Sequence, residues 1–255
     1  MMGYDTTPFK EMGISKYFPG RNIYEKYNYS RCAVVLSSFY MNETGFGDEI
    51  DSHEAVLRLN DAPTVGYEKS VGRKTTIRLL NSKCFNDSTF INDIEAMFVN
   101  TTLVTWKSGP YNGNLYKWYQ RESVKELLAK YIRWRMVQPS QDFYVINPTS
   151  LWDIWDDIMY FNKGKPIKKI VPSSGFTGLL MMLGLCDKVD VYGFGINDVS
   201  SCHYYDKPGC NSASKRWHPL QEKAIMAAMH DGPISDLDKH VVTVNGFKHI
   251  NCNGT

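Results

Sequence analysis

The chain alternates short β-branched runs with longer runs of helical periodicity, and this alternation limits the folds open to it. Strand-like runs are expected at residues 32–37, 56–59, 75–80, 99–106, 143–146 and 189–194. Helical runs are expected at 115–136, as one helix or a pair, at 150–160 with Ser150 as the cap, and at 176–185 and 219–229. Such alternation predicts an α/β domain with a largely parallel sheet. Residues 1–30 are polar and turn-rich, and we expect a surface lead-in there before a single domain over 31–255.

Charge and hydropathy exclude several classes of protein. The 255 residues include 29 basic and 27 acidic side chains, without a basic run, so no nucleic-acid partner is indicated. No apolar run reaches the roughly 18 residues that a membrane span requires. The first 21 residues also lack the apolar core of a signal peptide.

Cysteine and asparagine usage favours a secretory history. Six cysteines permit three bridges, whose connectivity the count alone leaves open. Acceptor sequons for N-glycosylation occur at Asn28, Asn42, Asn86, Asn100 and Asn253. A cytosolic location is the alternative.

Two kinds of segment are candidates for ligand binding. Residues 172–177 place two serines and a glycine just before a helical run, where unpaired backbone N–H groups form an anion site. Simple helix capping is the alternative. Asn60 and Asn81 each follow a strand-like run, so each could contact a nucleotide or close a strand end. Ligands of open α/β sheets bind at the carboxyl ends of strands, where we expect these segments to lie.

Two distant segments resemble the large and small sialylmotifs of animal-type sialyltransferases. Residues 32–81 contain C-A-V-V, I-D-S-H, V-L-R-L-N-D-A-P-T and V-G-R-K-T-T, and residues 171–197 contain P-S-S-G and L-C-D-K-V-D. The sequence is most similar to β-galactoside α-2,6-sialyltransferases through L-Y-K-W-Y-Q at 115–120, F-Y-V-I-N-P at 143–148, L-W-D-I-W at 151–155 and N-G-F-K-H-I-N-C at 245–252.

The resemblance implies a GT-A-like, single Rossmann-type domain and a specific reaction. Sialic acid would move from CMP-sialic acid to a galactose hydroxyl of a glycan, which is the 6-hydroxyl in the α-2,6 subgroup that the sequence resembles. The transfer would proceed with inversion and without a metal or other cofactor. The implied partners are the CMP-sugar donor and a galactose-terminated acceptor. The implied location is the Golgi lumen, with the cytoplasm or secretion as alternatives.

The resemblance also assigns residues. The implied catalytic base is His218 in R-W-H-P-L-Q-E-K-A, with Glu222 one residue closer than the family's H-x4-E spacing. His203 of the H-Y-Y-D motif would stabilise the leaving phosphate. The implied donor-binding residues are Ser38, Asn60, Asn81, Ser173, Ser174, Gly175 and Thr177. The implied acceptor-binding residues are Trp106, Lys107, Tyr204 and Trp217.

Disulfide pairing follows from the same resemblance. The family joins its two sialylmotifs, which predicts a bridge between Cys32 and Cys186, and we also expect Cys202 to pair with Cys210. Cys84 and Cys252 are then either a third pair or two free thiols.

Departures from the family pattern suggest other readings. Phe39 stands where the family usually has a glycine near the nucleotide, so it either packs in the core or reshapes the donor pocket for another ulosonic acid such as Kdo. The shortened His218–Glu222 spacing, and Lys107 where an aspartate is usual, would also fit an inactive CMP- or glycan-binding homologue. The D-x-D at 236–238 is expected in a polar loop and not as a metal site.

Overall fold

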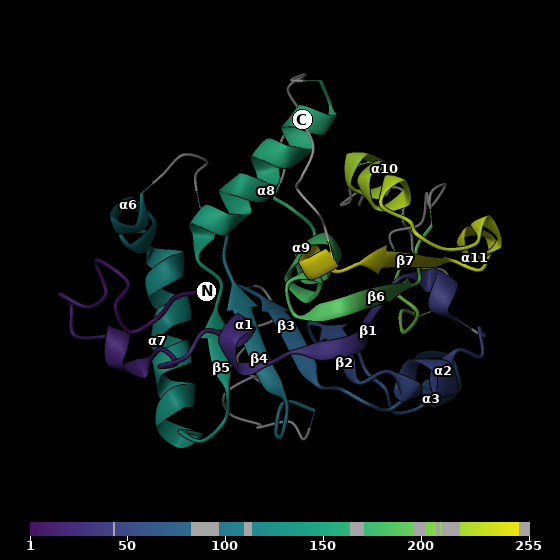
Figure 1. Cartoon of the computed structure of the whole chain (residues 1–255). Helices are drawn as coiled ribbons and strands as arrows, with labels where there is room; N and C mark the ends of the chain where they lie inside the picture. The colour runs from purple at the N-terminus through teal and green to yellow at the C-terminus, as the bar shows by residue number, and fades with distance from the viewer. Residues whose placement is uncertain are drawn as a thin grey trace.

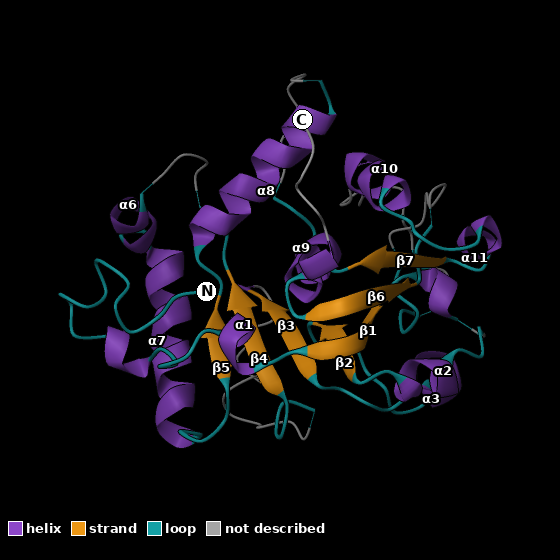
Figure 2. Ribbon diagram, in the orientation of Figure 1, coloured by secondary structure: helices purple, strands orange, loops and turns teal. Residues whose placement is uncertain are grey.

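A seven-stranded β-sheet with helices on both faces forms the body of the protein (Figures 1 and 2). The computed structural model describes residues 1–42, 44–82, 97–109, 114–163, 171–195, 202–207, 210 and 220–249. The strands are β1 (Tyr29–Val35), β2 (Ala55–Leu59), β3 (Ile77–Asn81), β4 (Thr102–Trp106), β5 (Phe143–Val145), β6 (Cys186–Tyr192) and β7 (Val241–Asn245). The predicted α/β class is confirmed.

The strand order places a crevice at the centre of the sheet. The order is β5-β4-β3-β2-β1-β6-β7, with parallel neighbours from β5 to β6 and an antiparallel β7, which was not predicted. The chain steps outward from β1 to β5 and then returns to β6 on the other side of β1. At this reversal, the segment that follows β1 leads to β2 on one side, and the segment that follows β6 leads to β7 on the other. Ligands of open α/β sheets bind in the crevice between two such segments.

The helices are α1 (Ile23–Lys26), α2 (Gly47–Ser52), α3 (Glu68–Val71), α6 (Leu115–Tyr119), α7 (Glu122–Val137), α8 (Pro148–Phe161), α9 (Ser174–Leu183), α10 (Leu220–Ala228) and α11 (Ile234–Asp238). Helices α6 to α10 lie at the expected positions, except at several boundaries, whereas α1, α2, α3 and α11 were not predicted. The run at 115–136 is thus a helix pair. Residues 236–238, expected in a loop, belong to α11. Among the described residues, no helix has the length and apolar character to cross a bilayer.

The start of α8 corrects the predicted cap. Asn147, and not Ser150, caps this helix, because its Oδ1 accepts the N–H of Thr149 at 3.1 Å. Pro148 occupies the first turn, where its missing N–H costs nothing and its fixed φ suits the helix. Pro148 therefore opens α8 shortly after β5 ends.

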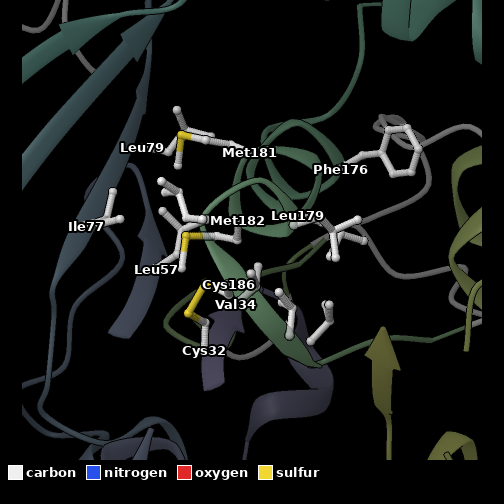
Figure 3. Packing of buried hydrophobic residues seen from close by; sticks show 14 of the residues in the cluster. Cys32, Val34, Leu57, Ile77, Leu79, Phe176, Leu179, Met181, Met182 and Cys186 are labelled. Carbon is white, nitrogen blue, oxygen red and sulfur yellow. A yellow bond between two sulfur atoms is a disulfide. The ribbon is translucent and has the colours of Figure 1, made fainter. Parts of the chain in front are cut away.

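Helix α9 packs across the middle of one face of the sheet. Its Leu179 and Met182 belong to the same buried cluster as Val34, Leu57 and other strand residues (Figure 3). A Cβ atom at Gly178 would lie only 2.7 Å from Leu57 Cδ2, so the missing side chain lets the helix approach β2 closely. The helix is therefore held at a fixed height above the sheet.

The opposite face is covered in two parts. At the β5 end, α7 packs with the N-terminal segment, whose buried side chains are Met2, Phe9 and Phe18. At the β1 and β6 end, α2 and α3 contribute buried residues such as Ile50 and Val71. Residues 1–30 were expected at the surface, but Met2, Phe9, Phe18 and Ile23 are buried in the core. Whether residue 30 marks a domain boundary stays a prediction.

Strands β1 and β6 are joined covalently on the α9 side. The predicted disulfide between Cys32 and Cys186 is confirmed, with the two Cα atoms 6.2 Å apart (Figure 3). It closes a loop over a sequence separation of 154 residues. In the chain-entropy model, a loop of this length stabilises the fold by roughly 4–5 kcal/mol.

The same two strands are joined by a buried carboxylate on the other side. Asp190 on β6 pairs with Ala33 on β1 and is 1% exposed. Its Oδ2 accepts Arg31 Nε–H at 2.6 Å and lies 2.9 Å from His53 Nε2, and its Oδ1 accepts the Thr243 hydroxyl at 2.5 Å. Burial raises the pKa of Asp190, but these hydrogen bonds outweigh burial and lower it to about 2. The folded state therefore holds a charged carboxylate here.

We expect Asp190→Asn to lower the free energy of unfolding by about 2–3 kcal/mol at pH 7, because the contacts of Arg31, His53 and Thr243 with the buried carboxylate would be weakened or lost. The lowered pKa stabilises the parent above the unfolded value of 3.8, and this stability is lost as pH falls through about 2. The difference between the proteins should therefore shrink with acidification. Urea unfolding at several pH values measures it, with the exposed Asp238→Asn as a control. A loss below about 1 kcal/mol at pH 7 would contradict this role for Asp190.

Candidate active site

A cavity of about 600 Å³ lies beyond the carboxyl ends of β1, β2, β3, β4 and β6. Its lining includes Leu36 after β1 and Gly193 after β6, so it occupies the crevice where the strand order reverses. The first turns of α9 and α10 complete it. The volume suits a drug-sized or nucleotide-sized ligand.

Most of the predicted donor-binding residues meet in this cavity. The lining includes Ser38, Asn60, Asn81, Ser173, Ser174 and Gly175. Thr177, one turn into α9, is absent from it and is 2% exposed. Its Oγ1 is buried without a hydrogen-bond partner among the described residues. The expected gathering of strand ends and helix start is therefore observed, apart from Thr177.

The two strand-end asparagines are tied to each other. Asn60 adopts a left-handed backbone with φ of 50°, which asparagine tolerates better than most residues. Its Oδ1 accepts the Asn81 N–H at 2.9 Å, and its carbonyl oxygen accepts the buried Arg78 Nη1 at 2.7 Å. Asn60 thus closes a strand end, which is one of the two roles suggested by the sequence. Its side-chain NH₂ group could still donate a hydrogen bond to a ligand.

Ser173 caps α9, and the next two residues of the helix, Ser174 and Gly175, face the cavity where a ligand could bind. Its Oγ accepts the Phe176 N–H at 3.0 Å, so the capping role is realised for this hydroxyl. A Cβ atom at Gly175 would lie 2.8 Å from Leu36 Cδ2, which shows how tightly the first turn packs on the end of β1. A side chain at Gly175 would push the helix start away from the cavity floor.

Glu222 connects α10 to the segment before α9. Its side chain is 1% exposed and lines the cavity, and its Oε1 accepts the Ser173 N–H at 2.8 Å. Burial raises the pKa of Glu222 and the hydrogen bonds with Ser173 oppose the shift, which leaves the pKa at about 7. Both protonation states of this carboxyl are therefore accessible near neutral pH.

The H-Y-Y-D segment is fixed beside the end of β1. The predicted Cys202–Cys210 disulfide is confirmed, and His203 forms an antiparallel bridge with Ser38. The His203 side chain is 48% exposed and lines the cavity, with Nδ1 3.4 Å from Asp206 Oδ2. Tyr204 does not line the cavity; it is buried and its hydroxyl donates to the Pro63 carbonyl oxygen. Tyr204, predicted to bind the acceptor, is therefore packed inside the loop and away from the cavity.

The predicted acceptor residues are only partly placed. Trp106 lines the cavity and is 6% exposed. Lys107 does not line it, but its Nζ lies 3.3 Å from Oγ of Ser82, which does. Burial lowers the pKa of Lys107. Trp217 and the proposed base His218 lie outside the described residues, as do Cys84 and Cys252.

Comparison with known proteins decides the family. The model of glycosyltransferase family 29 (sialyltransferase) matches residues 14–234. The chain belongs to this family. It is 38% identical to beta-galactoside alpha-2,6-sialyltransferase 2 of Danio rerio, over 96% of this chain and 49% of the relative. Identity to the Homo sapiens protein of the same name is 35%, over 96% of this chain and 47% of the relative. The chain spans about half the length of these relatives.

Solved structures agree on the fold. A mammalian sialyltransferase crystallised with Gal-beta-1-3GalNAc-ortho-nitrophenol is similar, with a TM-score of 0.56 and 18% identity, over 92% of this chain and 78% of that chain. A second mammalian sialyltransferase structure gives a TM-score of 0.57 and 20% identity, with the same coverage. At this identity, the likeness concerns the fold alone.

Phe39 departs from both roles suggested for it in this sialyltransferase sequence. Its side chain is 52% exposed, so it does not pack in the core, and it does not line the cavity. Its neighbour Ser38 lines the cavity instead and caps the short turn at Phe39–Met41. The position of Phe39 therefore gives no support to a different ulosonic acid donor.

Some cavity residues were missed from sequence. Gly193 and Gly195, which follow β6, line the cavity but were not among the predicted site residues. The rule that ligands bind where strands end could have indicated them. Lys223, which directly follows Glu222, also lines the cavity. Its position within the last family motif was the available signal.

The described residues offer one group spaced like metal ligands, namely Cys202, Asp206 and Cys210. Both cysteines are bonded to each other, so neither supplies a thiolate. Asp236 and Asp238 belong to no such group in the described part of the chain.

We expect the free energy of unfolding of Glu222→Gln, relative to that of the parent, to be higher at pH 8 than at pH 5 by up to about 3 kcal/mol. The reason is that the parent must bury a charge at the higher pH. The raised pKa gives the parent full stability below the unfolded value of 4.5, and this stability declines as pH rises through about 7. Glutamine can still accept the Ser173 N–H. Urea unfolding of both proteins at the two pH values measures the effect. An unchanged difference between them would show that Glu222 does not titrate as described.

Proposed function

We propose that the chain is the catalytic part of an inverting sialyltransferase with a GT-A-like, Rossmann-type domain. It would transfer sialic acid from CMP-sialic acid to a galactose hydroxyl, for which the names of its relatives favour the 6-hydroxyl. The observation that carries the proposal is one cavity lined by both sialylmotifs, with Asn60 and Asn81 from the large motif and Ser173–Gly175 from the small one. Family membership links this cavity to sialyl transfer.

The donor is an anion, and the start of α9 is suited to it. Backbone N–H groups in the first turn of a helix carry partial positive charge and lack partners within the helix. Ser174 and Gly175 bring such groups and a hydroxyl to the cavity. We assign the phosphate and sialic acid carboxylate of the donor to this region, and the cytidine to Ser38, Asn60 and Asn81.

Ser174→Ala and Asn81→Ala should each weaken CMP binding, by about 0.5–1.5 kcal/mol for a neutral hydrogen bond and more for one to the phosphate. Isothermal titration with CMP measures this without any transfer. The exposed Ser52→Ala, on α2, is a matched control and should bind like the parent. Parental affinity in both variants would place the nucleotide elsewhere.

The proposed chemistry is a single displacement at the anomeric carbon of sialic acid. His218 takes the proton of the acceptor hydroxyl as its oxygen attacks, and the bond to the CMP phosphate oxygen breaks. Negative charge grows on that phosphate, where His203 and the start of α9 stabilise it. CMP is a good leaving group, so no metal is assigned a step. Glu222 lines the cavity and belongs to the same short motif as His218, which it would help to orient.

His218→Ala should reduce transfer by about a hundred- to ten-thousand-fold while nearly preserving CMP affinity, since a base acts on the acceptor in the transition state. A transfer assay with CMP-sialic acid and N-acetyllactosamine measures it, with the linkage read by a linkage-specific sialidase. His203→Ala is the comparison variant and should lose both rate and donor affinity. A folded His218→Ala protein that retains more than about a tenth of the parental rate would exclude His218 as the base.

We place the reaction in the Golgi lumen. The Cys32–Cys186 and Cys202–Cys210 disulfides support an oxidising compartment, where such bonds persist. Three of the glycosylation acceptors, Asn28, Asn42 and Asn100, are exposed, which is compatible with modification in the same pathway.

A further inference from the structure

Glu222 makes a contact that its proposed relation to His218 does not explain. Its Oε1 accepts the backbone N–H of Ser173 at 2.8 Å, across a sequence separation of 49 residues. Ser173 is the N-cap of α9, so this bond fixes the segment that presents Ser174 and Gly175 to the cavity. The carboxyl is 1% exposed and lines the same cavity.

We propose that Glu222 is a positioning residue of the donor site, which holds the Ser173 backbone and favours the CMP phosphate most when its own carboxyl is neutral. Donor binding would then be coupled to the uptake of one proton by Glu222. The inference rests on the proposed function, because it takes the CMP moiety as the ligand of this cavity. It goes further by assigning Glu222 a role toward the donor in addition to its proposed role toward His218.

The physical reason is the conflict between two anions in one cavity. The carboxylate on the Ser173 N–H lies next to the N–H groups of Ser174 and Gly175 to which the phosphate is assigned, so the two anions repel each other at the same positive end of the helix. Protonation removes the repulsion, while the carbonyl oxygen of the neutral carboxyl can still accept the Ser173 N–H. Burial already raises the pKa of Glu222 to about 7, so the protonation requires little free energy near neutral pH.

The effect of Glu222 on the pH dependence of CMP binding must be distinguished from the effects of other ionisable groups nearby. Lys223 lies on the same helix, and His203 and Asp206 line the cavity with it. Helix α8, which packs against α10, carries Asp153, Asp156 and Asp157, whereas α9 contains no titratable residue. His203 is a second ionisable group in the cavity, and CMP has its own phosphate ionisation near pH 6. The pH dependence of the parent alone would therefore not isolate Glu222.

The test compares CMP affinity of the parent, Glu222→Gln and Glu222→Ala by isothermal titration between pH 6 and pH 8.5. Glutamine mimics the neutral carboxyl and keeps an oxygen for the Ser173 N–H, whereas alanine removes that support. The exposed Glu11→Gln changes the net charge equally and serves as the control. Cytidine, which lacks the phosphate, serves as the uncharged ligand.

We expect the ratio of parental to Glu222→Gln affinity for CMP to fall roughly five- to tenfold between pH 6 and pH 8, as the parental carboxyl ionises. The ratio cancels the ionisation of CMP and of His203, and for cytidine it should stay constant. Titration in two buffers of different ionisation enthalpy should show greater proton uptake by the parent than by Glu222→Gln near pH 7.5. Glu222→Ala should bind CMP about tenfold more weakly at pH 6 than Glu222→Gln.

A constant ratio across pH, or equal proton uptake in the parent and Glu222→Gln, would overturn the inference. Equal CMP binding by folded Glu222→Ala and Glu222→Gln would overturn the positioning role. If Glu222→Ala does not fold, the comparison of the parent with Glu222→Gln decides. These outcomes leave the proposed function intact, provided that the parent binds CMP and His218→Ala does too. Absence of CMP binding by the folded parent would instead reject the proposed function.

Discussion

The join between β1 and β6 is the constraint on which the site depends. These strands are far apart in the chain, since Cys32 and Cys186 are separated by 154 residues, yet they are neighbours in the sheet. The Cys32–Cys186 disulfide fastens them on the α9 side, and Asp190 fastens them on the other. Since the large sialylmotif contains β1 and the small one contains β6, the join also brings the two motifs together. Without this join, the residues of the two motifs would not line one common cavity beyond the carboxyl ends of β1 and β6.

Rigidity continues from this join to the groups that face the cavity. Asn60 and Asn81 are fixed to each other, and the buried Arg78 holds the backbone of Asn60. Arg58 lies beside Arg78 in the register of β2 and β3. Burial lowers the pKa of Arg58 to about 10, so its guanidinium is still charged at neutral pH. The site is thus built on strand ends whose side chains are already hydrogen-bonded, which favours a preformed donor pocket.

Periodicity in the sequence was sufficient to predict β1 to β6, α9 and α10, because their apolar residues recur locally. It failed where the decisive partner is distant or the signal is ambiguous. Asn147 and Ser150 are both good caps, and Pro148 can end a strand or open a helix, so only packing distinguishes them. Met2, Phe9 and Phe18 are isolated in a polar stretch, and their burial depends on α7. The antiparallel β7 depends on pairing with β6.

The bond between Glu222 and Ser173 has no sequence signature at all, since a backbone N–H exists at nearly every position. The family motif indicates that a glutamate follows the histidine, but it does not indicate what the glutamate contacts. A structural tie alone would be served by glutamine, which would bury no charge and would stabilise the fold at high pH. A titratable side chain in the same place permits two states of the pocket: the neutral state accommodates the phosphate, and ionisation weakens its hold. In the proposed reaction CMP would remain in the pocket after sialic acid has left, so loss of the same proton would favour release of this product. The stability sacrificed by burying a carboxyl group is therefore physically consistent with a site that must bind one anion and release another in every cycle.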